Sequence, residues 1–219
     1  MGPWLWAAMA MAGPVSESFD KEHRLTWVGI DLTEAEFFVP ETFDSKEDSV
    51  YWGPGGGLDD FVDKFENNDQ ARIKLSEDWN AMIVNETAPW LKKKLAAEIV
   101  VALAEPDGPS GRWVGAPFRP DFDAARVPAH FTEADVQRRV QLLATTGPGV
   151  GMVLIAERFS KTEAKACTWP TFFDLGTHAV LHTERVCKEP SGGGFRNYWL
   201  NPMRDTIREA ALGLKEGKW

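Results

Sequence analysis

Runs of apolar and β-branched residues predict the strands of this chain. Leu25–Leu32 is such a run, and a shorter one follows over Ala35–Val39. Val150–Phe159 is almost continuously apolar, which is typical of a strand buried on both faces. Ala96–Ala104 is compatible with a strand, because of Ile99–Val101, or with a continuing helix, because of its alanines.

Apolar residues at helical spacing predict the helices. The stripes are Leu58, Phe61, Val62 and Phe65; Leu75, Trp79, Met82 and Ile83; Val136, Val140 and Leu143; and Met203, Ile207, Ala210 and Leu214. The second helix is expected to end before Pro89, since the residue before a proline disfavours helical geometry. The third is expected to begin with a capping box of Thr132 and Asp135. Asn201 and Pro202 predict the start of the last helix.

The segment from Ala166 to Cys187 predicts a β-hairpin around the loop Gly176–His178. Pairing Leu175 with Ala179 sets the other cross-strand pairs: Phe173 with Leu181, Thr171 with Thr183, and Cys167 with Cys187. One face of the hairpin then carries Trp169, Phe173, Leu175 and Leu181. Pro170 interrupts the ladder, which predicts an edge strand or a bulge there.

This order of elements predicts an α/β fold: a mixed sheet with helices packed on it, and a C-terminal β-hairpin followed by a terminal helix. Such a fold requires one sheet that contains both Trp27–Asp31 and Val153–Ile155. The segments Pro40–Gly57 and Glu105–Pro128 are rich in turn residues and predict surface loops. Residues 13–219 are therefore expected to form a single domain.

The N-terminal stretch Pro3–Val15 carries no charge. It is shorter than the ~20 apolar residues that a membrane span needs. It is typical of the apolar core of a signal peptide, with Ala10–Ala12 as the cleavage site. Residues 1–12 are thus predicted to be a signal peptide, and the protein to be periplasmic or secreted, without an integral membrane span. Since no basic residue precedes the apolar stretch, a disordered or docked apolar tail is the alternative.

The two cysteines, Cys167 and Cys187, fall opposite each other in the predicted hairpin. An even pair of cysteines in an exported protein indicates a disulfide. Two buried free thiols are the alternative.

Charge and spacing argue against several kinds of ligand. The chain has 33 acidic and 24 basic residues and a net charge of −9, which disfavours nucleic acid as a partner. Gly55–Gly57 precedes a predicted helix, but Asp59 and Asp60 take the place of a bound phosphate. His178 and His182 would lie roughly 13 Å apart along a strand, too far for one metal ion. No metal and no cofactor is predicted.

The segment Gly192–Trp199, GGGFRNYW, is the candidate binding site. Glycine lets the backbone approach a partner closely, and Arg196, Asn197 and Tyr198 supply hydrogen-bond donors and an aromatic face. In the alternative interpretation the aromatic residues dock the last helix, and the polar side chains satisfy loop carbonyls.

Two segments, WVGIDL and TFFDLGTHAVLHTERVCKEPSGGGFRNYW, resemble a family of exported bacterial proteins of uncharacterised function. Members of that family open with a similar Val-Gly-Ile/Val-Asp strand and close with a Gly-Phe-Gly-x-Arg-Asn-Tyr-Trp-like segment before a helix. The hairpin also resembles the α/β domains of periplasmic assembly lipoproteins, such as curli-secretion proteins and the amino-terminal domain of the Tol-system propeller protein. These resemblances imply a role in the cell envelope without catalytic residues.

The predicted function is a non-catalytic binding or assembly module whose partner is a cell-envelope protein or polymer. The alternative is a hydrolase that acts on an envelope glycan through a carboxylate pair, such as Asp31 with Glu34 or Asp174 with Glu184. That enzyme requires two carboxylates ~5–9.5 Å apart in one cleft. Some of the 10 tryptophans would then serve as sugar platforms.

Overall fold

The structure, a computed structural model, describes residues 15, 19, 24–38, 76–103, 130–160 and 163–218, without the side chains of residues 37, 38, 194 and 195. The predicted signal peptide, the predicted helix at 58–65 and both predicted loops lie outside the described residues.

The described residues form a seven-stranded mixed sheet, and β1 pairs with β4 so that both Trp27–Asp31 and Val153–Ile155 belong to it. The predicted α/β class is therefore confirmed. The strands are β1 (Arg24–Asp31), β2 (Glu36–Phe38), β3 (Glu98–Val101), β4 (Val150–Ser160), β5 (Lys165–Asp174), β6 (Val180–Thr183) and β7 (Val186–Lys188).

The sheet has a parallel half and an antiparallel half that meet at β4. The strand order is β3-β1-β4-β5-β6, with β2 paired to the far end of β4 and β7 paired to β5. β1 runs parallel to β3 and β4, whereas β5 is antiparallel to β4, β6 and β7. Every residue of β4 is buried, as its apolar run predicts for a central strand covered on both faces.

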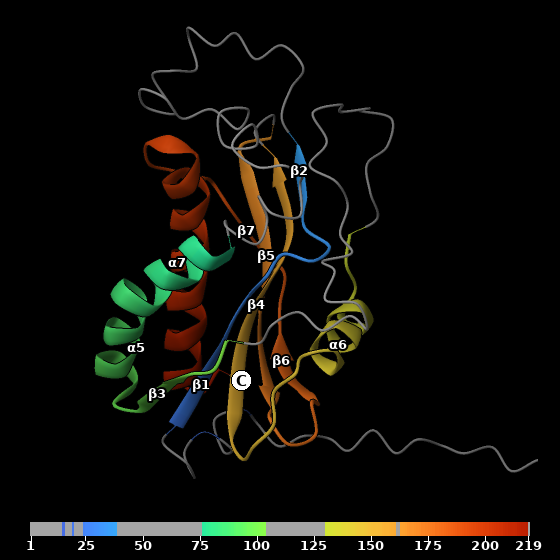
Figure 1. The fold of residues 1–219 in the computed structure, drawn as a ribbon, viewed down its shortest axis with the longest axis vertical. Helices are drawn as coiled ribbons and strands as arrows, with labels where there is room; N and C mark the ends of the chain where they lie inside the picture. Colours follow the sequence, from blue (N-terminus) through green and yellow to red (C-terminus); the bar gives the residue numbers. More distant parts are fainter. Residues whose placement is uncertain are drawn as a thin grey trace, which may run out of the picture.

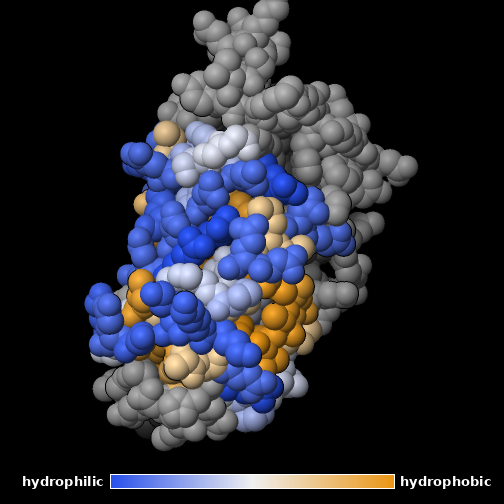
Figure 2. All heavy atoms as spheres, turned by 90° about the vertical axis from the view of Figure 1, so that its left-hand side faces the viewer, coloured by the Kyte–Doolittle hydropathy of each residue, from blue (hydrophilic) through white to orange (hydrophobic). Residues whose placement is uncertain are grey.

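Helices cover both faces of the sheet. Figure 1 shows α5 (Ala88–Leu95) and α7 (Gly194–Lys215) on one side and α6 (Glu133–Gln141) on the other. Trp27, Trp79 and Trp199 lie in the core beneath α5 and α7, and Val153 and Trp169 lie in the smaller core beneath α6. Seen from the side of α5 and α7, the surface is mostly hydrophilic, with an apolar area toward the right (Figure 2).

The second predicted helix does not end before Pro89. Residues 76–82 are helical and continue through a π-helical segment, η1 (Ile83–Thr87), directly into α5. Pro89 lies in the first turn of α5, and the change from π-helical to α-helical geometry falls just before it. The chain then turns at Ala96, whose φ is 52°, and enters β3, so the ambiguous segment 96–104 contains a strand.

α6 begins as its sequence predicts. The hydroxyl of Thr132 accepts the backbone N–H of Asp135 at 3.3 Å, and the Asp135 carboxylate accepts the backbone N–H of Thr132 at 2.9 Å. This capping box satisfies two N–H groups that a helix start leaves without partners.

The hairpin keeps two of the predicted pairs and changes the register near its loop. Thr171 pairs with Thr183, and Cys167 pairs with Cys187, as expected. A bulge between Phe172 and Phe173 pairs Phe173 with Val180 instead of Leu181. Leu181 therefore packs on the core beneath α7, while Phe173 packs beneath α6. The prediction that Leu181 shares a face of the hairpin with Phe173 is therefore wrong.

Pro170 lies on an interior strand, contrary to the expected edge position, because β5 has β4 on one side and β6 and β7 on the other. The interruption falls on the neighbouring strand instead. β6 pairs with residues 171–173 and β7 with residues 166–168, so neither pairs with Pro170. The gap between β6 and β7 thus accommodates a residue that has no N–H to donate.

α7 begins at Gly194, not at Asn201, and Pro202 lies inside it. A proline inside a helix leaves the carbonyl four residues earlier without its N–H. Here that carbonyl belongs to Tyr198, and it accepts the backbone N–H of Ser191 at 3.2 Å. The side-chain amide of Asn201 also donates to the Ser191 carbonyl at 2.8 Å. The predicted apolar stripe of this helix is buried.

Candidate functional site

The segment that the sequence singled out forms the first turns of α7. The carbonyl of Arg196 accepts the indole N–H of Trp79 at 3.0 Å, and the Tyr198 ring packs edge-on against Trp199 with centroids 4.8 Å apart. Asn197 is half-buried, and the Arg196 side chain is exposed. The backbone and aromatic rings of this segment therefore dock α7, and binding through Arg196, Asn197 and Tyr198 stays a prediction.

The acid pair Asp31–Glu34 is neutralised by arginines of α6. The Asp31 carboxylate is buried and accepts two hydrogen bonds of 2.6 and 2.8 Å from Nη2 of Arg139, and one of 2.9 Å from its Nε. Glu34 is ion-paired with Arg138 at 3.1 Å. Carboxylates held in this way anchor α6 to the end of β1, and they are poorly placed to transfer protons to a substrate.

In the other candidate acid pair, Asp174 with Glu184, Asp174 has a structural role. Asp174 accepts the backbone N–H groups of Gly176 at 3.1 Å and Thr177 at 2.7 Å, and so shapes the hairpin loop. Glu184 is exposed beyond the opposite end of β6. The whole of β6 therefore separates the two carboxylates.

A polar cluster that sequence reasoning missed surrounds Glu157 beneath α6. This carboxylate is 5% exposed and accepts hydrogen bonds from Trp169 Nε1 at 2.7 Å and Arg185 Nη2 at 2.7 Å. His130 Nδ1 lies 2.9 Å from the same carboxylate. Arg185 comes from the gap between β6 and β7 and reaches across β5 to make this contact. The sequence signal that could have revealed this cluster is Glu157 itself, a charged residue inside the apolar run of β4.

Burial by itself would raise the pKa of Glu157. The hydrogen bonds from Arg185, Trp169 and His130 outweigh burial and hold this pKa below the ordinary value of 4.5. Glu157 is therefore ionised at neutral pH, and the cluster links β4 to the hairpin and to the segment before α6.

We expect Glu157→Gln to destabilise the protein at pH 7, with a difference from the wild type that shrinks in acid. The Glu157 carboxyl group has a lower pKa in the folded state than in the unfolded state, so its ionisation stabilises the fold at any pH above the unfolded-state pKa. That contribution is lost as the pH falls through the folded-state pKa. Urea unfolding of both proteins between pH 7 and roughly pH 3 measures the difference. The control is Glu216→Gln, which removes an ion pair with Lys218 whose two side chains are 53% and 59% exposed. Parallel stability curves for wild type and Glu157→Gln would contradict the prediction.

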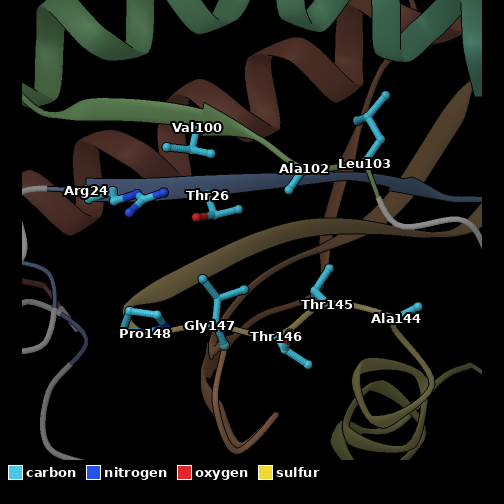
Figure 3. Close-up of a pocket in the computed structure, with 11 residues that line it drawn as sticks. Arg24, Thr26, Val100, Ala102, Leu103, Ala144, Thr145, Thr146, Gly147 and Pro148 are labelled. Atoms are coloured by element: carbon cyan, nitrogen blue, oxygen red, sulfur yellow. The ribbon is translucent and has the colours of Figure 1, made fainter.

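A cleft of about 400 Å³ opens between strands β1 and β3 on one side and segment 144–148, which joins α6 to β4, on the other. Figure 3 shows its lining side chains, contributed by both walls. The polar lining residues are Arg24, Thr26, Thr145 and Thr146, and the larger apolar ones are Val100, Leu103 and Leu175. No acidic residue is among the described residues that line it.

The hairpin loop holds one wall of this cleft in place. The carbonyl of Thr145 is hydrogen-bonded to Nε2 of His178, which has a φ of 57° and stacks edge-on against Phe173. The carbonyl of His178 in turn accepts the side-chain amide of Gln137 from α6 at 2.8 Å. His178 therefore serves to position the cleft wall.

Sequence reasoning did not find this cleft, since its residues come from four places that are far apart in the sequence: 24–26, 100–103, 144–148 and 175. The one local signal is Thr26, a polar side chain in the apolar run of β1, and it is buried in the cleft.

Of the tryptophans considered as sugar platforms, five lie among the described residues, and four of these are core residues. Trp27, Trp79 and Trp199 are at most 1% exposed, and Trp169 is 6% exposed. These indole rings are not available to stack on a sugar.

No protein-family model, no curated protein and no solved structure matches the chain. No helix among the described residues has both the length and the apolar character that a membrane crossing requires.

Proposed function

We propose that the protein is a non-catalytic binding module of the cell envelope and that its ligand binds in the cleft between β3 and segment 144–148. The observation that carries this proposal is the lining of the cleft, whose described residues combine one cation, three hydroxyl groups and an apolar wall and include no carboxylate. Such a surface can hold and orient a ligand, but it lacks the proton-transfer pair that a glycan hydrolase requires.

Two further features support a location outside the cytosol. Cys167 and Cys187 form a disulfide, which is typical of oxidising compartments such as the periplasm. The resemblance to exported proteins, carried by WVGIDL and by the segment that ends in GGGFRNYW, implies the same compartment. The partner in the envelope is proposed to be a protein or polymer that presents a small group to the cleft.

Two exposed leucines provide a matched test of the cleft. Leu103 lines it and is 49% exposed, whereas Leu142 is 48% exposed and lies outside its lining. We expect the wild type to bind the uncharged fluorophore N-phenyl-1-naphthylamine saturably. Leu103→Asp should weaken this binding about tenfold, because a carboxylate replaces apolar contact area. Leu142→Asp should leave it unchanged.

Two results would overturn the proposal. The first is equal binding of the fluorophore by Leu103→Asp and wild type. The second is release of new reducing ends when the wild type is incubated with peptidoglycan, which would show hydrolysis.

The double variant Arg196→Ala/Tyr198→Ala separates the cleft from the segment predicted on sequence grounds. If the cleft is the site, this variant binds the fluorophore like the wild type. A loss of binding with an unchanged thermal midpoint would place the site at the start of α7 instead.

A further inference from the structure

Arg24 is a half-buried cation, and none of the described residues that line the cleft is acidic. Its Nε is buried and has no hydrogen-bond partner among the described residues. Glu98 is its register partner on β3, yet these two side chains do not form an ion pair. The described arginines that do form ion pairs are Arg138, Arg139, Arg158, Arg185, Arg204 and Arg208. Arg24 is thus set apart from most arginines of the fold.

A buried hydroxyl elsewhere in the lining of the cleft also lacks a hydrogen-bond partner among the described residues. Thr145 is 8% exposed, and its Oγ1 has no hydrogen-bond partner within the described part of the chain. Buried polar groups are nearly always hydrogen-bonded, so an unsatisfied one in a cleft indicates a missing partner. Thr26, at 6% exposure, adds a second hydroxyl to the same floor.

The rest of the lining is apolar and small. The apolar lining residues are Val100, Ala102 and Leu103 from the β3 side, together with Ala144, Pro148 and Leu175. A volume of about 400 Å³ lies at the small end of the roughly 300–1,000 Å³ of small-molecule sites. The site therefore has room for a compact ligand with one polar end.

We propose that the cleft binds a small monocarboxylate with an apolar body. The carboxylate lies against the guanidinium of Arg24, whose planar fork of donors matches it. The apolar body lies against Val100, Leu103 and Leu175. A single cation balances a single negative charge. This inference rests on the proposed function, because it identifies the ligand class of the same cleft.

The test uses a pair of ligands that differ in charge alone. Octanoate and octanamide are compared as competitors that displace N-phenyl-1-naphthylamine from the wild-type protein. We expect octanoate to compete at a concentration about tenfold or more below that of octanamide, because a charge-assisted hydrogen bond forms with Arg24. Added salt should weaken octanoate and leave octanamide unchanged.

Two variants assign the effect to Arg24. Arg24→Gln should remove the preference for octanoate while the fluorophore still binds, which also shows that the variant is folded. Glu98→Gln should increase the preference, because it removes the carboxylate opposite Arg24. If Arg24→Gln does not fold, Arg24→Lys retains the charge without the fork and should show a reduced preference.

Equal competition by octanoate and octanamide in the wild type would overturn the carboxylate assignment and leave the proposed function intact, provided that fluorophore binding still depends on Leu103. Failure of the fluorophore test itself would instead remove the proposed function. Competition by a leucine-terminated pentapeptide with a free carboxyl group, but not by octanoate, would overturn the small-molecule assignment in favour of a polypeptide C-terminus.

Discussion

Arg139→Ala is expected to lower the free energy of unfolding by about 3–5 kcal/mol. Arg139 and Asp31 are each 7% exposed, and the guanidinium donates to both oxygens of the carboxylate. Without Arg139 the Asp31 carboxylate remains buried at the end of β1 with no countercharge of comparable geometry. Urea unfolding at pH 7 measures the loss.

The neighbouring residue supplies the control. Arg138 lies on the same helix and pairs with Glu34 at 3.1 Å, but its side chain is 51% exposed. Arg138→Ala should therefore cost less than about 1 kcal/mol, as exposed ion pairs do. Equal losses for the two variants would refute the distinction between the buried and the exposed pair.

A double variant separates the pair from its surroundings. If the loss in Arg139→Ala comes from an uncompensated charge, then Asp31→Asn introduced alongside it should recover part of the stability. Additive losses would indicate that the packing of the Arg139 side chain, and not its charge, is responsible.

Removal of the disulfide is expected to cost about 3 kcal/mol. Cys167 and Cys187 are joined with a Cα–Cα distance of 4.1 Å and a sequence separation of 20. The cross-link restricts the unfolded chain, and it also fixes the short strand β7 to β5. Urea unfolding of the wild type should be compared with that of Cys167→Ser/Cys187→Ser, which forms no mixed disulfides.

Two controls accompany this comparison. The wild type in reductant should match the double serine variant, since Cys187 is exposed and accessible to a thiol. Thiol titration of unreduced, denatured wild type should find no free thiol, and two free thiols would reject the cross-link in solution. Arg185 lies two residues before Cys187 and hydrogen-bonds to Glu157 from beside β7. The double serine variant should therefore also show a smaller stability difference between wild-type Glu157 and Glu157→Gln at pH 7.

The sequence by itself predicted the features that depend on neighbouring residues or on short periodicities. The run Val150–Phe159 predicts the buried central strand, and Thr132 with Asp135 predicts the capping box of α6. The cysteine pair followed from counting residues outward from the hairpin loop. In each case the determining interactions lie within one element or between two elements joined by a short loop.

Three predictions from local rules were wrong. Pro202 predicts a helix start, yet α7 passes through it because Ser191 donates to the freed carbonyl of Tyr198. Pro89 predicts a helix end, yet a π-helical segment leads into it. Leu181 was assigned to the wrong face because a bulge near the loop shifts the register by one residue.

The tertiary structure alone decided which acids pair with which arginines and where a ligand can bind. Asp31 meets Arg139, and Glu157 meets Arg185, across long separations in sequence that leave no periodic pattern. The cleft likewise brings Arg24 from the start of β1 and Thr145 from the segment before β4 into one lining. Hydrophobic periodicity fixes which face of an element is buried, but the contacts between polar groups of different elements depend on how those elements pack.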